Sequence, residues 1–131
     1  MAGEVTQQEG PNAKQATYWN EVAGPKWVQL SQAINGQIQP IGRAAMERAQ
    51  IEPGQRVLDV GCGCGHTSID LAHRVGSEGE VHGVDLSEPM LAEARTQGAG
   101  LAQLRFSQAD VQTEDLGEGR YHRIFSRFGV M

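Results

Sequence analysis

A short glycine-rich segment carries the residues whose types and spacing point most directly to chemistry. It reads Asp59-Val60-Gly61-Cys62-Gly63-Cys64-Gly65 and follows an apolar, β-branched run that is typical of a buried strand. Glycines allow a close approach of the backbone to a ligand, because they carry no side chain. Dinucleotide cofactors favour G-x-G-x-x-G, but here the third glycine position is His66 and the spacing is G-x-G-x-G. In addition, Asp59 would repel a pyrophosphate and would suit an ammonium or a sulfonium group.

Two further acids follow later predicted strands. Asp85 comes 20 residues after Gly65 at the end of the second strand, and Asp110 lies just past the third. Ligands of parallel sheets bind at the carboxyl ends of the strands, where these acids would meet. There Asp85 can accept hydrogen bonds from both hydroxyls of a ribose, and Leu86 can pack on an adenine face. Asp110 can accept from an exocyclic amino group, with the backbone around Ala109 facing a ring nitrogen. The pattern indicates a site for an adenosyl group joined to a cationic amino acid, without phosphate.

Alternating strands and helices must position these residues. We predict strands at 56–60, 80–85, 104–106 and 121–126, a helix at 67–75, and a further helix capped by Ser87 and ended by Gly98. Ahead of them we predict a short helix at 12–22, a break at Gly24-Pro25, and an amphipathic helix with a kink or split near Pro40. This order predicts an α/β fold, a Rossmann-like doubly wound parallel sheet with N-terminal helices.

Length and composition exclude several classes of protein. The 131 residues suffice for one domain, and the net charge of −5 argues against a sequence-independent nucleic-acid binder. No apolar run approaches the roughly 20 residues of a membrane span, and no secretory signal is recognisable, so we expect a cytoplasmic protein without membrane partners. Cys62 and Cys64 are too few for a zinc site and badly spaced for a disulfide, so we expect no metal and two small buried thiols.

Three segments together resemble the class I S-adenosylmethionine-dependent methyltransferases. They are Val57-Leu58-Asp59-Val60-Gly61-Cys62-Gly63-Cys64-Gly65, then Val84-Asp85-Leu86-Ser87-Glu88-Pro89-Met90-Leu91, then Gln108-Ala109-Asp110. The N-terminal Tyr18-Trp19-Asn20 and the ending Phe125-Ser126-Arg127-Phe128-Gly129-Val130-Met131 are similar to a bacterial subgroup that acts on small molecules and is often labelled by likeness to ubiquinone and menaquinone biosynthesis enzymes. The resemblance runs from about Gln15 to the last residue.

The resemblance implies transfer of a methyl group from S-adenosylmethionine to a small-molecule acceptor. By position, Gly61, Gly63 and Gly65 would surround the methionyl part, and Asp59 would help to hold its amino group. Asp85 would bind the ribose and Asp110 the adenine, while Ser126 and Arg127 would lie by the methionyl end, close to the acceptor. The expected cofactor-binding set is Asp59, Gly61, Cys62, Gly63, Gly65, Asp85, Leu86, Met90, Ala109, Asp110, Ser126 and Arg127.

No catalytic residue is assigned. We interpret His66 as a helix-start residue partly in solvent rather than a general base. Tyr18, Trp19 and Trp27 are interpreted as helix-packing aromatics, with a contact of Tyr18 or Trp19 to the cofactor left open, because N-terminal helices often cover the cofactor in this architecture.

The expected organisation is a flexible tail at 1–14, N-terminal helices at 15–50 that cap the cofactor, and the N-terminal half of the cofactor-binding domain at 51–131. The family's sheet has seven strands, and this sequence stops after the fourth. We therefore expect a fragment whose bare fourth strand could self-associate. Two alternatives remain open, namely a non-catalytic half-domain that binds the cofactor or a partner and, less favoured, an NAD(P)-dependent oxidoreductase.

Overall fold

A four-stranded parallel sheet forms the centre of the computed structural model, which describes residues 10–131. Its strands are β1 (Arg56–Val60), β2 (Glu80–Asp85), β3 (Leu104–Gln108) and β4 (Arg123–Phe125), in the spatial order β3-β2-β1-β4. All three strand pairs are parallel, and Val57 of β1 pairs with Val81 of β2 and Arg123 of β4. The α/β prediction is confirmed, and β1 and β2 have the bounds expected from the sequence.

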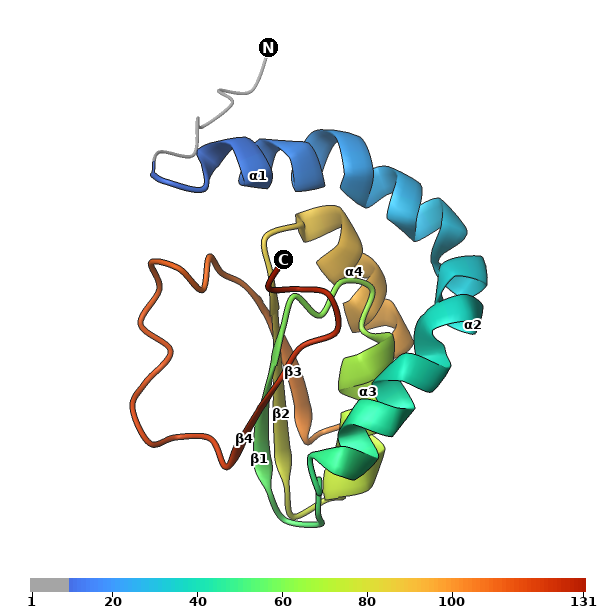
Figure 1. Ribbon diagram of the computed structural model, residues 1–131, viewed down its shortest axis with the longest axis vertical. Coiled ribbons are helices and arrows are strands. Elements are labelled where there is room, and N and C mark those ends of the chain that lie inside the picture. The colour runs from blue at the N-terminus through green and yellow to red at the C-terminus, as the bar shows by residue number, and fades with distance from the viewer. Residues whose placement is uncertain (1–9) are drawn as a thin grey trace.

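Helices cover one face of this sheet (Figure 1). α3 (His66–Val75) connects β1 to β2, and α4 (Glu88–Gln97) connects β2 to β3. Ser87 is the N-cap of α4 as expected, and its hydroxyl accepts from the amide of Met90. The core on this face consists of Met46, Val57, Leu71, Ala72, Val75, Val81 and Phe125.

The other face of the sheet is covered by the connection at 109–122 instead of a helix (Figure 1). Leu58 and Val60 alternate with Val57 and Asp59 along β1, so they point to this face and pack with Val84 and Ala109 against Leu116 and Tyr121. His82 reinforces the contact, because its ring nitrogens lie 2.9 Å from the Tyr121 hydroxyl and 2.8 Å from the Ser107 hydroxyl. Burial lowers the pKa of His82 to about 4, so the ring is neutral at pH 7.

The N-terminal helices form one continuous arch, which corrects two sequence-based expectations. α1 (Ala13–Thr17) passes through a π-helical turn, η1 (Tyr18–Val22), into α2 (Ala23–Arg48). The predicted break at Gly24-Pro25 is wrong, because Pro25 falls in the first turn of α2, where its missing N–H costs little. Pro40 does not split α2, which instead curves along its length (Figure 1). Most of the expected tail at 1–14 lies outside the described residues, and helix begins within its end, at Ala13.

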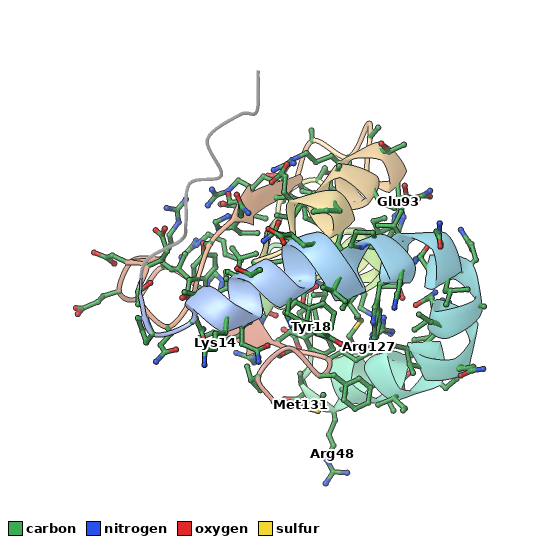
Figure 2. The ribbon with its side chains drawn as sticks, turned by 90° about the horizontal axis from the view of Figure 1, so that it is seen from above. Lys14, Tyr18, Arg48, Glu93, Arg127 and Met131 are labelled. Carbon is green, nitrogen blue, oxygen red and sulfur yellow. The ribbon has the colours of Figure 1, made fainter. Side chains whose placement is uncertain are left out.

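Hydrogen bonds dock this arch onto the turn between β2 and α4. The Ser87 hydroxyl donates to the carbonyl of Trp19 at 2.7 Å, and the Asn20 amide donates to the carbonyl of Leu86 at 2.9 Å and accepts from the amide of Glu88. Gly24 permits the close approach, since a Cβ there would lie 2.0 Å from the Trp19 carbonyl oxygen and 2.4 Å from the Ser87 hydroxyl. The arch is therefore held across the carboxyl ends of the strands (Figure 2).

The last strand is shorter than expected. β4 covers Arg123–Phe125 instead of 121–126, and its outer edge has no partner strand among residues 10–131. Phe125 is buried, but Ile124 is 72% exposed. Across the described part of the chain, no helix combines the length and apolar character that crossing a membrane requires. The same residues contain no cluster of three or more histidine, cysteine or acidic side chains suited to a metal ion.

Candidate functional site

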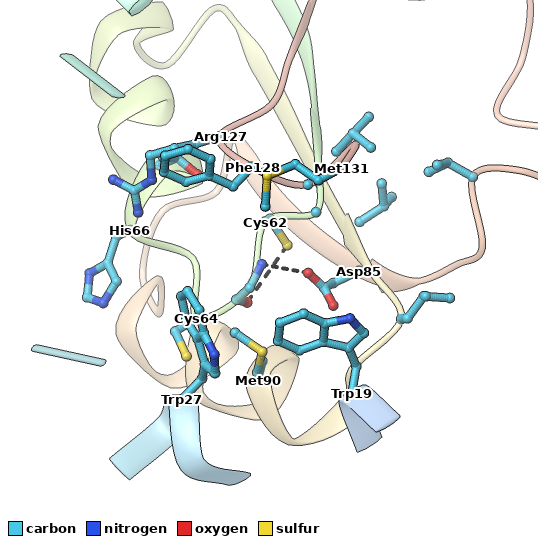
Figure 3. Close-up of a pocket in the computed structure, with 18 of the residues that line it drawn as sticks. Trp19, Trp27, Cys62, Cys64, His66, Asp85, Met90, Arg127, Phe128 and Met131 are labelled. Carbon is cyan, nitrogen blue, oxygen red and sulfur yellow. Dashed lines mark hydrogen bonds between the residues drawn. The ribbon is translucent and has the colours of Figure 1, made fainter. Parts of the chain in front are cut away.

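A pocket of about 310 Å³ lies between the carboxyl ends of the strands and the N-terminal arch (Figure 3). Its walls come from the arch, the glycine-rich turn, the ends of β2 and β3, and the last residues of the chain. The lining includes Asn12, Trp19, Trp27, Ser31, Asn35, Gly61, Cys62, Gly63, Cys64, His66, Asp85, Leu86, Met90, Ala109, Asp110, Arg127, Phe128 and Met131. The volume falls within the range of small-molecule sites.

Most of the residues expected at a cofactor line this pocket. They are Gly61, Cys62, Gly63, Asp85, Leu86, Met90, Ala109, Asp110 and Arg127. Asp59, Gly65 and Ser126 are not part of the lining, and each has a structural role behind it. The Ser126 hydroxyl donates to the carbonyl of Val60 at 2.8 Å and accepts from the amide of Gly129. Gly65 has a φ of +89° and leaves no room for a Cβ beside Ala94, so it packs the turn against α4.

Asp85 connects the two loops that frame the pocket. One carboxylate oxygen accepts from the amide of Gly63 at 2.8 Å, and the other accepts from the amide of Ser87 at 2.9 Å. Burial raises the pKa of this carboxyl, and the backbone hydrogen bonds oppose that shift. Each oxygen keeps a further lone pair, so Asp85 can still accept hydrogen bonds from ligand hydroxyls.

Four of the five amides of the glycine-rich turn, all but that of Cys64, are already engaged within the protein. Gly61 and Cys62 donate to the carbonyl of Val84, Gly63 donates to Asp85, and Gly65 donates to the carbonyl of Cys62. Phosphate-binding loops of dinucleotide enzymes instead present free amides to the pyrophosphate. This turn therefore suits a ligand without phosphates, which disfavours the dinucleotide alternative.

Asp59 lies beneath the turn and is fully buried. One of its oxygens accepts from the hydroxyls of Thr67 and Ser68 at 2.6 and 2.7 Å, which fastens the start of α3 to β1. The other oxygen is buried without a hydrogen-bond partner among the described residues. Burial raises the pKa of Asp59 to about 6, although the two hydroxyls and Arg127 lower it. Its expected contact with a ligand amino group stays a prediction.

At the far side of the pocket, Asp110 is bound by the N-terminal arch. One of its oxygens accepts from the side-chain amide of Asn12 at 3.1 Å and from the backbone amide of Gln112 at 3.0 Å. The amide of Ala109 donates to the carbonyl of Asp85 at 3.0 Å, so this group is not available to a ring nitrogen. Of the two expected adenine contacts, the one from the amide of Ala109 is therefore excluded. The carboxylate of Asp110 can still accept a hydrogen bond from an adenine amino group.

Two tryptophans of the arch also line the pocket; the sequence left a ligand contact open for Trp19, whereas Trp27 was interpreted only as a helix-packing residue. The rings of Trp19 and Trp27 meet edge to face with centroids 5.9 Å apart, and both face the cavity (Figure 3). Tyr18 contacts Trp19 but is 49% exposed and is not part of the lining. Trp19 lies in the π-helical turn and Trp27 in α2, so the two rings reach the cavity from different parts of the arch.

The two cysteines flank Gly63 and are buried free thiols, as expected. Burial raises the pKa of Cys62 well above its usual range and that of Cys64 to about 11, so both remain protonated at pH 7. A protonated thiol is a weak nucleophile. The cysteines therefore contribute shape to the pocket and no covalent chemistry.

The comparisons with known proteins agree with this geometry. The family described as "Methyltransferase domain" matches residues 57–131, and the chain belongs to this family.

Three curated relatives and one solved structure illustrate the range of similar proteins. The chain is 37% identical over 95 residues to aklanonic acid methyltransferase DauC of Streptomyces sp. (strain C5), covering 66% of this chain and 43% of that protein. It is 33% identical to demethylmenaquinone methyltransferase of Geobacillus kaustophilus, with 65% and 37% covered. It is 35% identical to the 23S rRNA (uracil(1939)-C(5))-methyltransferase RlmD of Acinetobacter baumannii, with 79% and 21% covered.

An S-adenosylmethionine-dependent methyltransferase from Mesorhizobium loti shares the fold, with 30% identity, a TM-score of 0.57, and 68% of this chain and 38% of that one covered. The family resemblance seen in the sequence is confirmed. The chain spans less than half the length of these relatives.

Proposed function

We propose that this chain is the cofactor-binding half of a methyltransferase that uses S-adenosylmethionine and acts on a small-molecule acceptor. The observation that carries the proposal is an acid-lined pocket beside a glycine turn in which four of the five amides are already bonded internally. Such a pocket fits hydroxyls and a positive charge, and its turn offers a phosphate few amide donors. Family membership and the S-adenosylmethionine-dependent relative from Mesorhizobium loti support the cofactor.

Each part of the ligand has a proposed partner. Asp85 would accept hydrogen bonds from the ribose hydroxyls, Leu86 would pack on the adenine, and Asp110 would accept a hydrogen bond from the adenine amino group. The turn from Gly61 to Gly65 would enclose the methionyl part, with Met90 and Cys62 filling the wall beside it. Residues 15–50 would cap the ligand, and residues 51–131 would form the N-terminal half of the cofactor domain.

The bound cofactor would supply a methyl group on a sulfonium sulfur, which keeps the electron pair when the methyl moves to a nucleophilic atom of the acceptor. The residues of this chain would contribute position and exclusion of water. Trp19 and Trp27 would shield the site from solvent, and Asp85 would fix the ribose and therefore the direction of attack. The aklanonic acid and demethylmenaquinone relatives support a small-molecule acceptor. The free thiols support a reducing compartment, the cytoplasm.

Calorimetry tests the cofactor. We expect S-adenosylhomocysteine to bind the chain with micromolar affinity and NAD not to bind detectably. Binding of NAD alone would overturn the proposal and revive the oxidoreductase alternative.

A transfer assay tests the acceptor class. A radiolabelled methyl donor would be offered with demethylated quinols and aromatic acids in one arm and with ribosomal RNA in the other, because one relative acts on 23S rRNA. The assay would compare this chain with a form extended by the three further strands that the family resemblance implies. We expect small-molecule transfer by the extended form. Labelling of RNA alone would contradict the acceptor assignment, and binding without transfer in either form would favour the non-catalytic half-domain.

A further inference from the structure

Ser87 lies between two walls of the pocket and bonds to both. It is fully buried in the turn between β2 and α4. Its amide donates to the Asp85 carboxylate at 2.9 Å, and its hydroxyl donates to the carbonyl of Trp19 at 2.7 Å. Asp85 lines the cavity from the sheet, and Trp19 lines it from the arch (Figure 3). A single buried residue therefore connects the sheet wall with the arch wall.

The π-helical turn η1 frees the carbonyl of Trp19 from the amide of Ala23. That amide donates to the carbonyl of Tyr18, five residues before it. In an α-helix the same amide would donate to the carbonyl of Trp19, four residues before it. Turns of this kind are rare and occur frequently at functional sites. In this chain the turn and the hydrogen bond from Ser87 involve the same carbonyl, so a change in one affects the other.

Gly24 sets how closely the arch approaches Ser87. A Cβ at this position would lie 2.4 Å from Ser87 Oγ and 2.0 Å from the carbonyl oxygen of Trp19. A larger residue at position 24 would have to displace one of these two groups. The contact between Ser87 and Trp19 thus depends on the shape of α2 as well as on the hydrogen bond.

Asn20 holds the residues on either side of Ser87. Its side-chain amide donates to the carbonyl of Leu86 at 2.9 Å and accepts from the amide of Glu88 at 2.9 Å. Within its own helix it also donates to the carbonyl of Ala16 at 2.7 Å. The arch therefore cannot withdraw from the pocket without pulling on the residues that follow Asp85.

The orientation of Asp85 depends in turn on Ser87. One carboxylate oxygen accepts from the amide of Gly63 at 2.8 Å, and the other accepts from the amide of Ser87. If Ser87 moves, the second oxygen loses this donor and the carboxylate is free to rotate about its side-chain bonds. The lone pairs assigned to ligand hydroxyls would then point elsewhere.

We propose that Ser87 is a positioning residue for the ligand of this pocket, whose amide orients the Asp85 carboxylate and whose hydroxyl holds Trp19 in place. This inference rests on the proposed function, because Asp85 is there assigned to a ribose. It adds that the affinity for a nucleoside depends on a π-helical turn 68 residues earlier in the chain.

The affinity for S-adenosylhomocysteine, measured by calorimetry, tests this role. Ser87→Ala removes the hydroxyl and keeps the backbone amide. Because Ser87→Ala also removes the N-cap of α4, Ser87→Gly is measured beside it, since glycine replaces an N-cap serine at little cost. Thr96→Ala is the control, because it removes an exposed hydroxyl near the other end of α4. We expect about a fivefold loss for both Ser87 variants, which is the contribution of a typical hydrogen bond, and no loss for Thr96→Ala.

A double-mutant cycle shows whether the hydroxyl of Ser87 acts through Trp19. Trp19→Phe is combined with Ser87→Ala, and the same affinity is measured. In the Trp19→Phe background, Ser87→Ala should cost at most about twofold, because the ring that the hydroxyl positions is no longer there. A purely structural role of Ser87 would give the same loss in both backgrounds.

Fluorine NMR gives a second measurement that needs no ligand. A chain labelled with 5-fluorotryptophan carries one signal for each of its two tryptophans, and Trp19→Phe assigns them. The Trp19 signal should move in Ser87→Ala and stay in place in Thr96→Ala.

Three results overturn the role of Ser87 alone: Ser87 variants that bind like Thr96→Ala, equal losses in both Trp19 backgrounds, or a Trp19 signal that does not respond to Ser87→Ala. A wild-type chain that does not bind S-adenosylhomocysteine refutes the proposed function, and this inference with it. Thermal unfolding shows that each variant is folded at the temperature of the measurement, and Ser87→Gly replaces Ser87→Ala in the cycle and in the NMR comparison if the latter is not.

Discussion

At the scale of single residues, the carboxylates of the site have different tasks. Asp85 joins the two loops of the pocket and keeps lone pairs for a ligand, whereas Asp59 stabilises the start of α3 from below. The sequence predicted both acids at the right edge of the sheet. It could not separate their roles, because the alternation of side chains along β1 and the hydroxyls of Thr67 and Ser68 decide which acid faces the cavity.

Replacing Asp85 tests the proposed ribose contact. Asp85→Asn keeps the shape of the side chain but turns one acceptor into a donor. We expect at least a tenfold loss of affinity for S-adenosylhomocysteine, which is about 1.4 kcal/mol, measured by calorimetry. Glu114→Gln, at an exposed position of the connection at 109–122, is the matched control. Equal affinities of the two variants would exclude the contact.

The buried carboxyl of Asp59 should make the folded chain less stable as pH rises, the reverse of the usual effect of a carboxyl group. Its pKa is about 6 in the folded chain against 3.8 ordinarily, so the folded state binds the proton more tightly than the unfolded state. The contribution of this group to the unfolding free energy therefore falls as pH rises from about 4 to 6. Between pH 4.5 and 7.5 the loss is about 2 kcal/mol, at about 1.4 kcal/mol for each unit of pKa shift.

Asp59→Asn should remove this loss. Urea denaturation would give the unfolding free energy of the wild type and of the variant at pH 4.5 and pH 7.5. Subtracting the change with pH in the variant from that in the wild type leaves the contribution of Asp59, because the other titrating groups cancel. Glu78→Gln, an exposed change, should behave like the wild type. An Asp59→Asn variant with the same pH dependence as the wild type would show that the carboxyl is not perturbed.

At the scale of elements, the arch is the part that sequence patterns described least well. Glycine and proline at 24 and 25 are typical of a break, yet the chain stays helical there. The reason is a tertiary contact: Gly24 packs against the carbonyl of Trp19 and the hydroxyl of Ser87. By contrast, β1, β2 and α4 were predicted almost to the residue, because their apolar periodicity and caps are local signals.

Two glycines of α2 should respond in opposite directions to alanine. Gly24→Ala introduces a Cβ into the docking contact and should destabilise the chain by about 1–3 kcal/mol. Gly36→Ala meets no atom within 4 Å and should stabilise it by up to about 1 kcal/mol through helix propensity. Thermal unfolding followed by tryptophan fluorescence would measure both. Destabilisation by Gly36→Ala, or none by Gly24→Ala, would contradict the docking described here.

At the scale of the whole molecule, the two faces of the sheet are covered unequally. The helical face has a continuous core, whereas within residues 10–131 the opposite face has only the connection at 109–122, held by Leu116, Tyr121 and the hydrogen bond to His82. Beside it, Ile124 is exposed on the edge strand β4. The bare edge was expected from the resemblance to a family with a seven-stranded sheet, but the sequence did not predict how thinly the second face would be covered.

The exposed edge predicts association of the chain with itself. Ile124→Lys should reduce concentration-dependent self-association in sedimentation equilibrium, because a charge on an edge strand opposes pairing. Leu30→Lys, which replaces an exposed apolar residue on α2, is the control. If both variants associate like the wild type, β4 is not the contact.

The hydrogen bond from Asn12 to Asp110 couples the start of the arch to whatever binds in the pocket beneath it. A side-chain amide offers a carboxylate the same N–H group that the amine of an adenine would offer. The base and the start of the arch would thus share one carboxylate, in which one oxygen already accepts from Asn12 and Gln112. A bound base that draws Asp110 toward itself would weaken the hydrogen bond of Asn12 and loosen the chain before Trp19. Binding in the cavity would then be detected as faster exchange of backbone hydrogens near Ala13.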